Sequence, residues 1–386
     1  MCRAAPPPGP APTRPGAPQP MPTRRLAVIL VLCLCAPALL ADTIHLSNGR
    51  EVKCLISKES YATIEYRKAG MSSKQSVDVA DVVSVEYSKT SADWREAMVL
   101  LDQGEMGKAA SSFLAVADDD NREPHLRASA LAQAGDALVT NGNYNDAIGV
   151  YDELLKKHPS TRHLARALLG KGQSLFYVRK LAEADAVLTQ LKSDATSKGL
   201  GERWALDAEF LLLWSAEAQG KPDVVDGYKQ LRASARANYP GIANKASLRM
   251  GRVHLENNQV RDAEALFDEI VLSRMHTSDD VVAGAYNGLG RCNFGRAQGL
   301  LSDGKADQAL PYVHDALLDF LRVHVSYPGV RKEQAEALYF AGQCFLNLAA
   351  MDPEATQAEQ RGQVLLKRCR DNFAGSEWAG LAASQR

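Results

Sequence analysis

One stretch of the sequence, GDALVTNGNYNDAIGVYDELLKKHP from Gly135 to Pro159, recurs in varied form through most of the chain. In five of the copies, an alanine is followed four positions later by an aromatic or apolar residue. These pairs are Ala109 and Phe113, Ala147 and Tyr151, Ala184 and Leu188, Ala263 and Phe267, and Ala309 and Val313. The alanines are 38, 37, 79 and 46 residues apart, and the step of 79 contains one degenerate copy. A period of this length predicts stacked supersecondary units, because one such unit cannot bury its apolar face alone.

Each copy also carries a small residue upstream and a helix-ending signal at its end. The upstream residues are Gly135, Gly172, Gly251, Gly290 and Gly342, with Leu213 in the degenerate copy. The joints between copies hold Pro159, Pro240 and Pro328, each after His or Tyr, and Ala374 after Phe373. Proline cannot continue a helix, so each copy predicts two helices that end cleanly. We expect the small residues to let these helices approach and the aromatic to fill the gap to the next unit.

These landmarks resemble those of the tetratricopeptide repeat (TPR), a helix–turn–helix unit of about 34 residues. The resemblance covers residues 91–386 and implies a right-handed α-α superhelix of about seven helical hairpins. The fourth (206–235) and sixth (283–323) are the least regular. Units of this length with these joints are also similar to the periplasmic TPR proteins of barrel assembly and cell-division coordination. The expected fold class is therefore mainly α, a TPR-type solenoid preceded by a small all-β module.

The resemblance further implies that the first helix of each hairpin lines a concave binding surface. The residue after each small position then points inward, which gives Asp136, Gln173, Trp214, Arg252, Arg291 and Gln343. About one helical turn away, the same face holds Phe176, Tyr177, Phe210, Asn287 and Tyr339. Aromatic side chains beside two arginines suit an extended peptide with a carboxylate or acidic side chain, because Arg presents a planar fork of donors. The other interpretation is that these aromatics form the core between repeats.

Residues 42–88 alternate apolar and polar side chains in five short runs, and Asn48-Gly49 is a strong hairpin signal. We expect a small, strongly bent antiparallel sheet or barrel of SH3-like or Sm-like type. Its opening, DTIHLSNGR, resembles the short β domain at the front of many exported bacterial proteins. That resemblance implies an adaptor or docking role without chemistry. The module lacks the stripe of aromatic and basic residues that single-stranded nucleic acid favours.

The N-terminus has two parts. Residues 1–20 are rich in proline, so we expect them to be disordered, or to precede the true start at Met21. In residues 21–41, two arginines, a short apolar run and small residues follow one another, which is the layout of a secretory signal peptide. The apolar run is shorter than the roughly 20 residues that cross a bilayer. We expect an exported protein, periplasmic or extracellular, without a membrane span after cleavage; retention by an uncleaved signal is the alternative.

The sequence offers no constellation for catalysis. His158 and His163 have no further metal ligands beside them and are interpreted as a joint residue and a surface residue. The GLGRCNFG segment at 288–295 lacks the glycine spacing and the preceding strand of a dinucleotide site. We therefore expect no enzymatic activity, no cofactor and no metal. After residue 41 we expect the cysteines to be buried and reduced; they are Cys54, Cys292, Cys344 and Cys369.

Charge narrows the class of partner. The chain has 45 Lys and Arg against 46 Asp and Glu, and the four arginines of residues 1–41 leave 41 against 46 for the rest. This balance argues against a nucleic-acid partner. The sequence thus predicts a non-catalytic scaffold of the bacterial cell envelope that binds a protein or an extended peptide. The alternative is a protein of the cell wall or its carbohydrates that uses the β module, and a hydrolase is a distant alternative. The oligomeric state stays open.

Overall fold

The computed structural model describes residues 41–68, 71–351, 355 and 357–384. Apart from Ala41, the Pro-rich extension and the expected signal peptide lie outside the described residues, as does the Ala69-Gly70 pair. Residues 41–386 form one unit of the chain. Within its described part, none of the helices combines the length and the apolar composition that crossing a bilayer requires.

Five antiparallel strands come first and form one sheet in the order β4-β3-β2-β1-β5. Their bounds are β1 Asp42–Leu46, β2 Glu51–Glu59, β3 Thr63–Lys68, β4 Gln75–Asp78 and β5 Val82–Glu86, with a 3₁₀ helix, η1 Val79–Asp81, before β5. The hairpin of β1 and β2 turns at Asn48-Gly49, where Gly49 has φ +79° and the Arg50 N–H donates to Asn48 Oδ1. Glycine adopts this φ without strain, and the predicted turn is confirmed.

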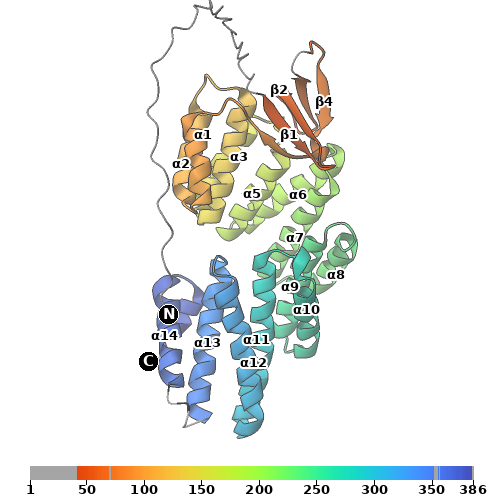
Figure 1. Ribbon diagram of the computed structural model, residues 1–386. Coiled ribbons are helices and arrows are strands. Elements are labelled where there is room, and N and C mark those ends of the chain that lie inside the picture. The colour runs from red at the N-terminus through yellow and green to blue at the C-terminus, as the bar shows by residue number, and fades with distance from the viewer. Residues whose placement is uncertain (1–40, 69–70, 352–354, 356, 385–386) are drawn as a thin grey trace, which may run out of the picture. The chain divides into compact units, whose positions relative to one another are not determined.

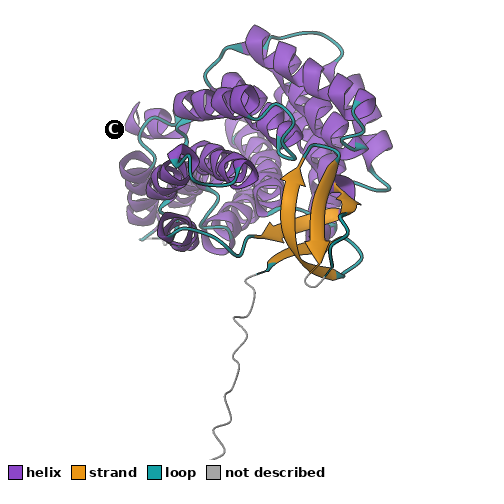
Figure 2. Ribbon diagram, turned by 90° about the horizontal axis from the view of Figure 1, so that it is seen from above, coloured by secondary structure: helices purple, strands orange, loops and turns teal. Residues whose placement is uncertain are grey.

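One face of the sheet encloses a small core, and the sheet is bent. The core consists of Ile44, Val52, Cys54, Ile64 and Tyr66. Register shifts after His45 in β1 and after Ile56 in β2 bend the strands, as β-bulges do. Figure 2 shows the strands as a curved layer beside the helices. The small antiparallel sheet is as predicted, and its SH3-like or Sm-like character stays a prediction.

Fifteen α-helices follow in the described residues, and the first fourteen pair in sequence as helical hairpins (Figure 1). Their bounds are α1 Ala92–Asp102, α2 Met106–Asp118, α3 Pro124–Asn141, α4 Tyr144–Lys157, α5 Leu164–Tyr177, α6 Leu181–Ser197, α7 Glu202–Ala218, α8 Val224–Ala235, α9 Pro240–Glu256, α10 Val260–Leu272, α11 Asp279–Ser302, α12 Ala306–Ser326, α13 Arg331–Met351, α14 Ala358–Asn372 and α15 Glu377–Ser384, with the 3₁₀ helix η2 Arg274–His276 after α10. The last helix, α15, packs against α13 and α14. This TPR-like solenoid confirms the predicted fold class.

The predicted fit between small and aromatic residues explains how the helices approach. A Cβ atom at Gly251 on α9 would lie 2.5 Å from the ring of Phe267 on α10. A Cβ at Gly288 on α11 would lie equally close to another edge of that ring. Phe267 therefore fills the space between its own hairpin and the next, and it is fully buried. The two glycines thus serve packing, because no larger residue fits against the ring.

Two hairpins depart from this pattern. In the fourth, Leu213 on α7 stands where other units have glycine, and a Cβ at Gly227 on α8 would collide with the Leu213 side chain. The large and the small residue have exchanged helices, so the close approach is kept. In the sixth, the residue that packs on Gly290 is Phe320 rather than the expected Val313. The helices α11 and α12 have 24 and 21 residues. On α12, Phe320 lies about two helical turns after Val313.

Candidate functional site

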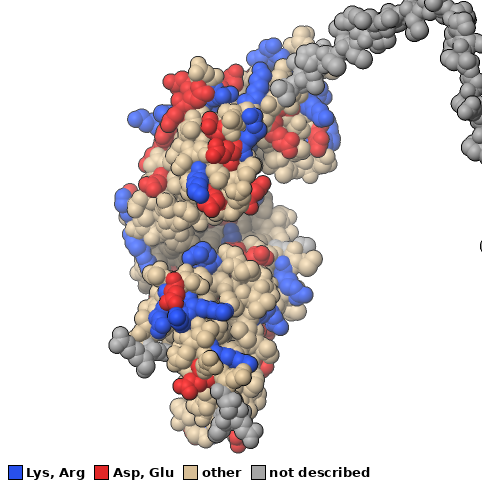
Figure 3. Space-filling model, turned by 60° about the vertical axis from the view of Figure 1, so that its left-hand side comes forward, with Lys and Arg blue, Asp and Glu red and all other residues tan. Residues whose placement is uncertain are grey.

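Two adjoining cavities, of about 300 and 840 Å³, lie on the face formed by the first helices of the hairpins. All their helical lining residues belong to α5, α7, α9, α11, α13 and α15. We call the residues that line both cavities the Trp214 groove: Tyr177, Trp214, Arg249, Arg252 and Lys332. Figure 3 shows a hollow in the surface with Lys and Arg atoms around it.

Aromatic rings from successive hairpins form one side of the groove. Tyr177 stacks on Tyr144 with ring centroids 4.6 Å apart, and its ring lies edge-on to Trp214 at 6.1 Å. Phe176 and Phe210 contact Trp214 at 4.8 and 6.0 Å. Contacts of this kind fix the orientation of each ring. Trp214 and Tyr177 remain partly exposed, so both a packing role and a binding role are physically open to them.

The smaller cavity has a mainly apolar interior. Its apolar lining residues, besides the aromatic ones, are Leu169, Leu211, Leu248, Val281 and Val330. They come from α5, α7, α9, α11 and the loop before α13, so the cavity requires the curvature of several hairpins. An apolar cavity with a few polar groups at its edge is the usual form of a ligand site.

Two cations lie over the Trp214 ring and differ in their partners. Arg249 Cζ is 5.0 Å and Lys332 Nζ 5.1 Å from the ring centroid, within the range of cation–π attraction. Arg249 also forms a two-point ion pair with Glu217, in which its Nε donates at 3.0 Å. Lys332 is exposed and, among the described residues, has no hydrogen-bond or ion-pair partner. Although the residue as a whole is exposed, its ammonium group lies against the Trp214 ring, and its pKa is lowered first by loss of hydration and then by the neighbouring Arg252.

The two arginines predicted to receive a ligand carboxylate already face carboxylates of the protein. Arg252 Nη2 donates to both oxygens of Glu333, at 2.9 and 2.8 Å, and Arg291 lies 3.6 Å from Glu336. Burial lowers the pKa of Arg252, but the carboxylates outweigh it and the net pKa is raised. Burial raises the pKa of Glu336. These arginines therefore brace α9 and α11 against α13, which corrects the prediction that they offer their donors to a ligand carboxylate.

The structure brings together some of the predicted residues and separates the others. Six line one or both cavities: Gln173, Phe176, Tyr177, Phe210, Trp214 and Arg252.

The other predicted residues lie elsewhere. Arg291 lines a separate pocket with Phe340. Asn287 is fully buried, and its side-chain amide donates to Glu333. Asn287 is thus a core residue, which corrects the groove prediction. Tyr339 packs on Trp378 at 5.6 Å. Neither Tyr339 nor Gln343 lines these two cavities, and Asp136 is held by Arg166 and Tyr151.

Two residues of the groove were not predicted. Arg249 is three positions before Arg252 on α9, so it shares that helix face and helical periodicity could have identified it. Lys332 stands at the start of α13, far in sequence from Trp214, and no local pattern marks it. It reaches the groove only because the stacked hairpins bring α13 towards α7. The position of Lys332 beside Trp214 is thus a product of tertiary structure.

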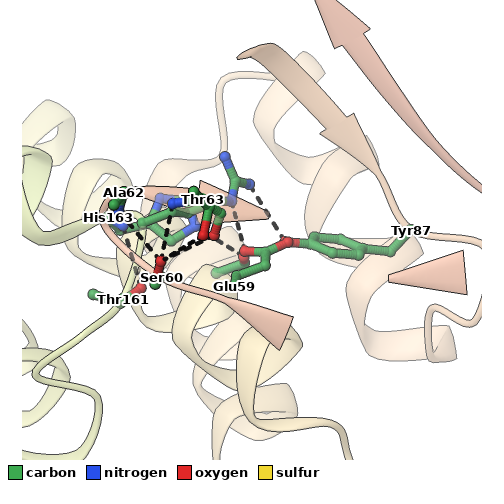
Figure 4. Close-up of polar contacts among 9 residues, drawn as sticks. Glu59, Ser60, Ala62, Thr63, Tyr87, Thr161 and His163 are labelled. Carbon is green, nitrogen blue, oxygen red and sulfur yellow. Dashed lines mark hydrogen bonds and ion pairs between the residues drawn. The ribbon is translucent and has the colours of Figure 1, made fainter. Parts of the chain in front are cut away.

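A second polar cluster lies at the contact between the sheet and the solenoid, where Figure 4 shows Glu59, Tyr87 and His163. It includes a Ser–His pair, Ser129 and His163. Tyr87 donates to Glu59 Oε1 at 2.8 Å, because a carboxylate paired with Arg162 only accepts. Ser129 then donates to the Tyr87 oxygen at 2.7 Å and accepts from His163 Nε2 at 2.9 Å. In a catalytic pair, the histidine would instead act as a base and accept the proton of the serine hydroxyl. Both side chains are also buried, with Ser129 2% and His163 6% exposed. His163 is therefore a core residue, which corrects its interpretation as a surface residue.

The remaining expectations concern cysteines and metals. All four described cysteines are buried, as predicted, and burial raises the pKa of the Cys54 and Cys369 thiols to about 11. In the described part of the chain, no three His, Cys, Asp or Glu residues are grouped so as to hold a metal ion.

Comparison with known proteins bears on the fold. Residues 132–196, from within α3 to the end of α6, match the family model described as Tetratricopeptide repeat. No curated protein matches the chain significantly in sequence.

Among solved structures, the chain is similar to a tetratricopeptide repeat protein from Parabacteroides merdae, with 14% identity, a TM-score of 0.45, and coverage of 75% of this chain and 97% of that one. It is also similar to PilW, a type IV pilus biogenesis factor, with 17% identity, a TM-score of 0.43, and coverage of 66% and 98%. A third is NprR in complex with its cognate peptide NprX, with 11% identity, a TM-score of 0.46, and coverage of 76% and 81%. The chain is thus a five-stranded antiparallel sheet followed by a TPR-like solenoid, with the TPR sequence signature in residues 132–196.

Proposed function

We propose that this protein is a non-catalytic scaffold that binds an extended peptide in the Trp214 groove. The observation that supports this most is the position of Trp214, which lines both the smaller, mainly apolar cavity and the larger one and lies beneath two cations. A peptide that crosses Trp214 can place side chains in both cavities. Solenoid repeats commonly bind their partners on such an extended inner face.

The chemistry of the two cavities specifies the peptide. The smaller cavity accepts a bulky apolar side chain, because its interior is lined by leucines, valines and Phe210. Lys332 has no ion-pair partner among the described residues, so an acidic group of the peptide can pair with it without breaking a contact. Arg249 is committed to Glu217, and Arg252 to Glu333. The proposed ligand is therefore an extended segment with a bulky apolar residue and an acidic residue close to it.

We propose further that the protein acts in the bacterial cell envelope, after export. This part of the proposal rests on the signal-like layout of residues 21–41. An envelope scaffold would meet its ligand as a tail or linker of another exported protein, which is where extended segments occur.

An array of short synthetic peptides tests the proposed function. The array varies one bulky apolar position and one acidic position independently, and the purified protein is applied to it. We expect retention only on peptides that carry both features. Trp214→Ala is expected to abolish retention because it removes the aromatic surface shared by the two cavities. Lys332→Glu is expected to do the same because it reverses the charge that pairs with the acidic residue of the peptide.

The matched control is Lys156→Glu, the same charge reversal at an exposed lysine on α4 that lines neither cavity. Circular dichroism of each variant establishes that it is folded. Retention that is equal for the wild type and for a folded Trp214→Ala variant would contradict the proposal, and so would a wild type that retains no peptide.

A further inference from the structure

A second groove lies on the other helices of the last two hairpins. It has a volume of about 340 Å³ and runs between α12 and α14 over Phe345 of α13. Its lining residues are Leu321, His324, Phe345, Gln360, Arg361, Val364, Leu365 and Arg368. None of them lines the Trp214 groove, so the second groove is a separate surface.

Apolar side chains extend this groove along α12. Leu318 is 60% and Val325 74% exposed, and they stand three residues before and four after Leu321. Residues at this spacing share one face of a helix. Val364, on the opposite wall, is 43% exposed. Single exposed apolar residues are common, but a continuous set beside an apolar groove indicates an interaction surface.

Cations stand at both ends of the α14 wall. Arg361 and Arg368 are seven residues, or about 10 Å, apart along the helix, with Val364 between them. Arg361 donates to Gln357 Oε1, and neither arginine forms an ion pair with a described residue. The groove therefore presents a cation–apolar–cation pattern to solvent.

The first helix of the solenoid carries the complementary pattern. On α1, Met98 and Val99 are 41% and 53% exposed. Glu96 and Asp102 stand three residues to either side of Val99, about 9 Å apart along the helix. Both are exposed and form no ion pair with a described residue. The one cation of this helix, Arg95, donates to the Thr90 carbonyl oxygen at 3.0 Å.

We propose that α1 of one copy docks into the α12–α14 groove of a second copy. Met98 and Val99 then cover Val364 and the exposed side chains of α12. Glu96 and Asp102 face the two arginines, whose spacing along α14 is nearly the same. An amphipathic helix in a groove between two helices is a common mode of recognition. The two surfaces differ, so the contact is heterologous, and copies add head to tail in an open series.

Sedimentation velocity of the purified protein, over a range of concentrations at low salt, tests this proposal. We expect the weight-average sedimentation coefficient to rise with concentration and to fall towards the monomer value at high salt, because the paired charges are exposed. The head-blocked variant, Glu96→Lys with Asp102→Lys, and the tail-blocked variant, Arg361→Glu with Arg368→Glu, are each expected to sediment as monomers.

Mixing the variants gives the decisive result. Head-blocked and tail-blocked chains together pair each groove with an α1 of opposite charge, the unchanged groove with the unchanged α1 and the reversed groove with the reversed α1, so the mixture is expected to associate as the wild type does. A chain with all four reversals is expected to associate again. The control is Lys367→Glu, an exposed reversal on α14 outside the groove lining, which is expected to behave as the wild type. A wild type that is monomeric at every concentration, or a blocked variant that on its own associates as it does, would overturn the proposal.

Discussion

Glu59 and Arg162 are 103 positions apart in the sequence, yet Arg162 Nε donates to Glu59 Oε2 at 2.7 Å. Their side chains are 3% and 16% exposed, so the pair is largely removed from water. The Tyr87 hydroxyl donates to the other carboxylate oxygen, and Tyr61 N donates to the Ser160 carbonyl oxygen close by. The sheet is therefore held to the start of the third hairpin by specific polar contacts.

Removing one partner of this pair should destabilise the protein strongly. Glu59→Ala leaves the Arg162 charge buried and unpaired, and we expect a loss of about 3–5 kcal/mol in the free energy of unfolding. Urea denaturation measures it. The control is Lys157→Ala, which breaks an exposed pair with Glu153 and should change the free energy of unfolding far less, because exposed ion pairs add little to stability. Equal, small effects of the two substitutions would show that the sheet contact adds little to stability.

Stability should also fall in mild acid because of His163. Burial lowers the His163 pKa well below its ordinary value, and the nearby Arg162 and Arg166 lower it further. In the unfolded chain the imidazole takes up a proton below about pH 6.5, whereas in the folded chain it stays neutral. The unfolded state then binds more protons, so stability decreases as the pH falls, by up to about 1.4 kcal/mol per pH unit from this residue.

Urea unfolding at several pH values between about 5 and 7.5 measures this dependence. The comparison is with His163→Gln, whose side chain cannot titrate but keeps an N–H donor for Ser129. We expect the free energy of unfolding to fall more steeply with falling pH in the wild type than in the variant. The two slopes should differ by the uptake of up to one proton on unfolding. Parallel curves for the two proteins would mean that His163 takes up its proton in the folded state as well.

Two glycine substitutions should have opposite signs. Gly251→Ala places a Cβ 2.5 Å from the buried Phe267 ring, and overpacking of this kind costs about 1–3 kcal/mol. Gly149 on α4 is exposed and has nothing within 4 Å of its Cβ position. Gly149→Ala should therefore stabilise the protein by about 0.5–1 kcal/mol, because alanine favours the helix. Thermal unfolding of both variants checks the signs, and a stabilising Gly251→Ala would contradict the packing role of that glycine.

The helical hairpins were predictable because their contacts repeat at fixed sequence spacing. Gly251 and Phe267 belong to one unit, and the same small-and-aromatic fit recurs in Gly135 and Tyr151. The exchange of Leu213 and Gly227 was not predictable from the repeat, since complementarity can be met with either helix carrying the large residue. Local spacing determines that two helices approach, but not which of them carries the large side chain.

The candidate site was only partly predictable, for a different physical reason. Trp214 was identified because the resemblance to the tetratricopeptide repeat implies that the residue after each small position faces inward, and the helical period of 3.6 residues then extends that face. Asn287 obeys the same period but is covered by α13, and Lys332 enters the groove from that helix. Both outcomes depend on how far the stacked hairpins curve. Small rotations at each joint set this curvature, and the local sequence pattern does not encode them.

The N-terminus gives a prediction independent of the fold. If residues 21–41 act as a cleaved signal, the mature chain begins between Leu39 and Thr43, around the start of β1 at Asp42. Mass spectrometry of the intact protein from its native host measures this directly. A mature protein that still carries residues 1–20 would contradict both cleavage and a start at Met21.

The central claim is that Trp214 and Lys332 form the peptide-binding surface, and a fluorescence anisotropy titration tests it most directly. The probe is a labelled peptide selected on the array, titrated with the wild type, Trp214→Ala, Lys332→Glu and the control Trp204→Ala. Trp204 shares α7 with Trp214 but lines neither cavity. We expect the first two substitutions to raise the Kd at least about tenfold, or about 1.4 kcal/mol, and Trp204→Ala to leave it unchanged. The same Kd for all four folded proteins would contradict the claim.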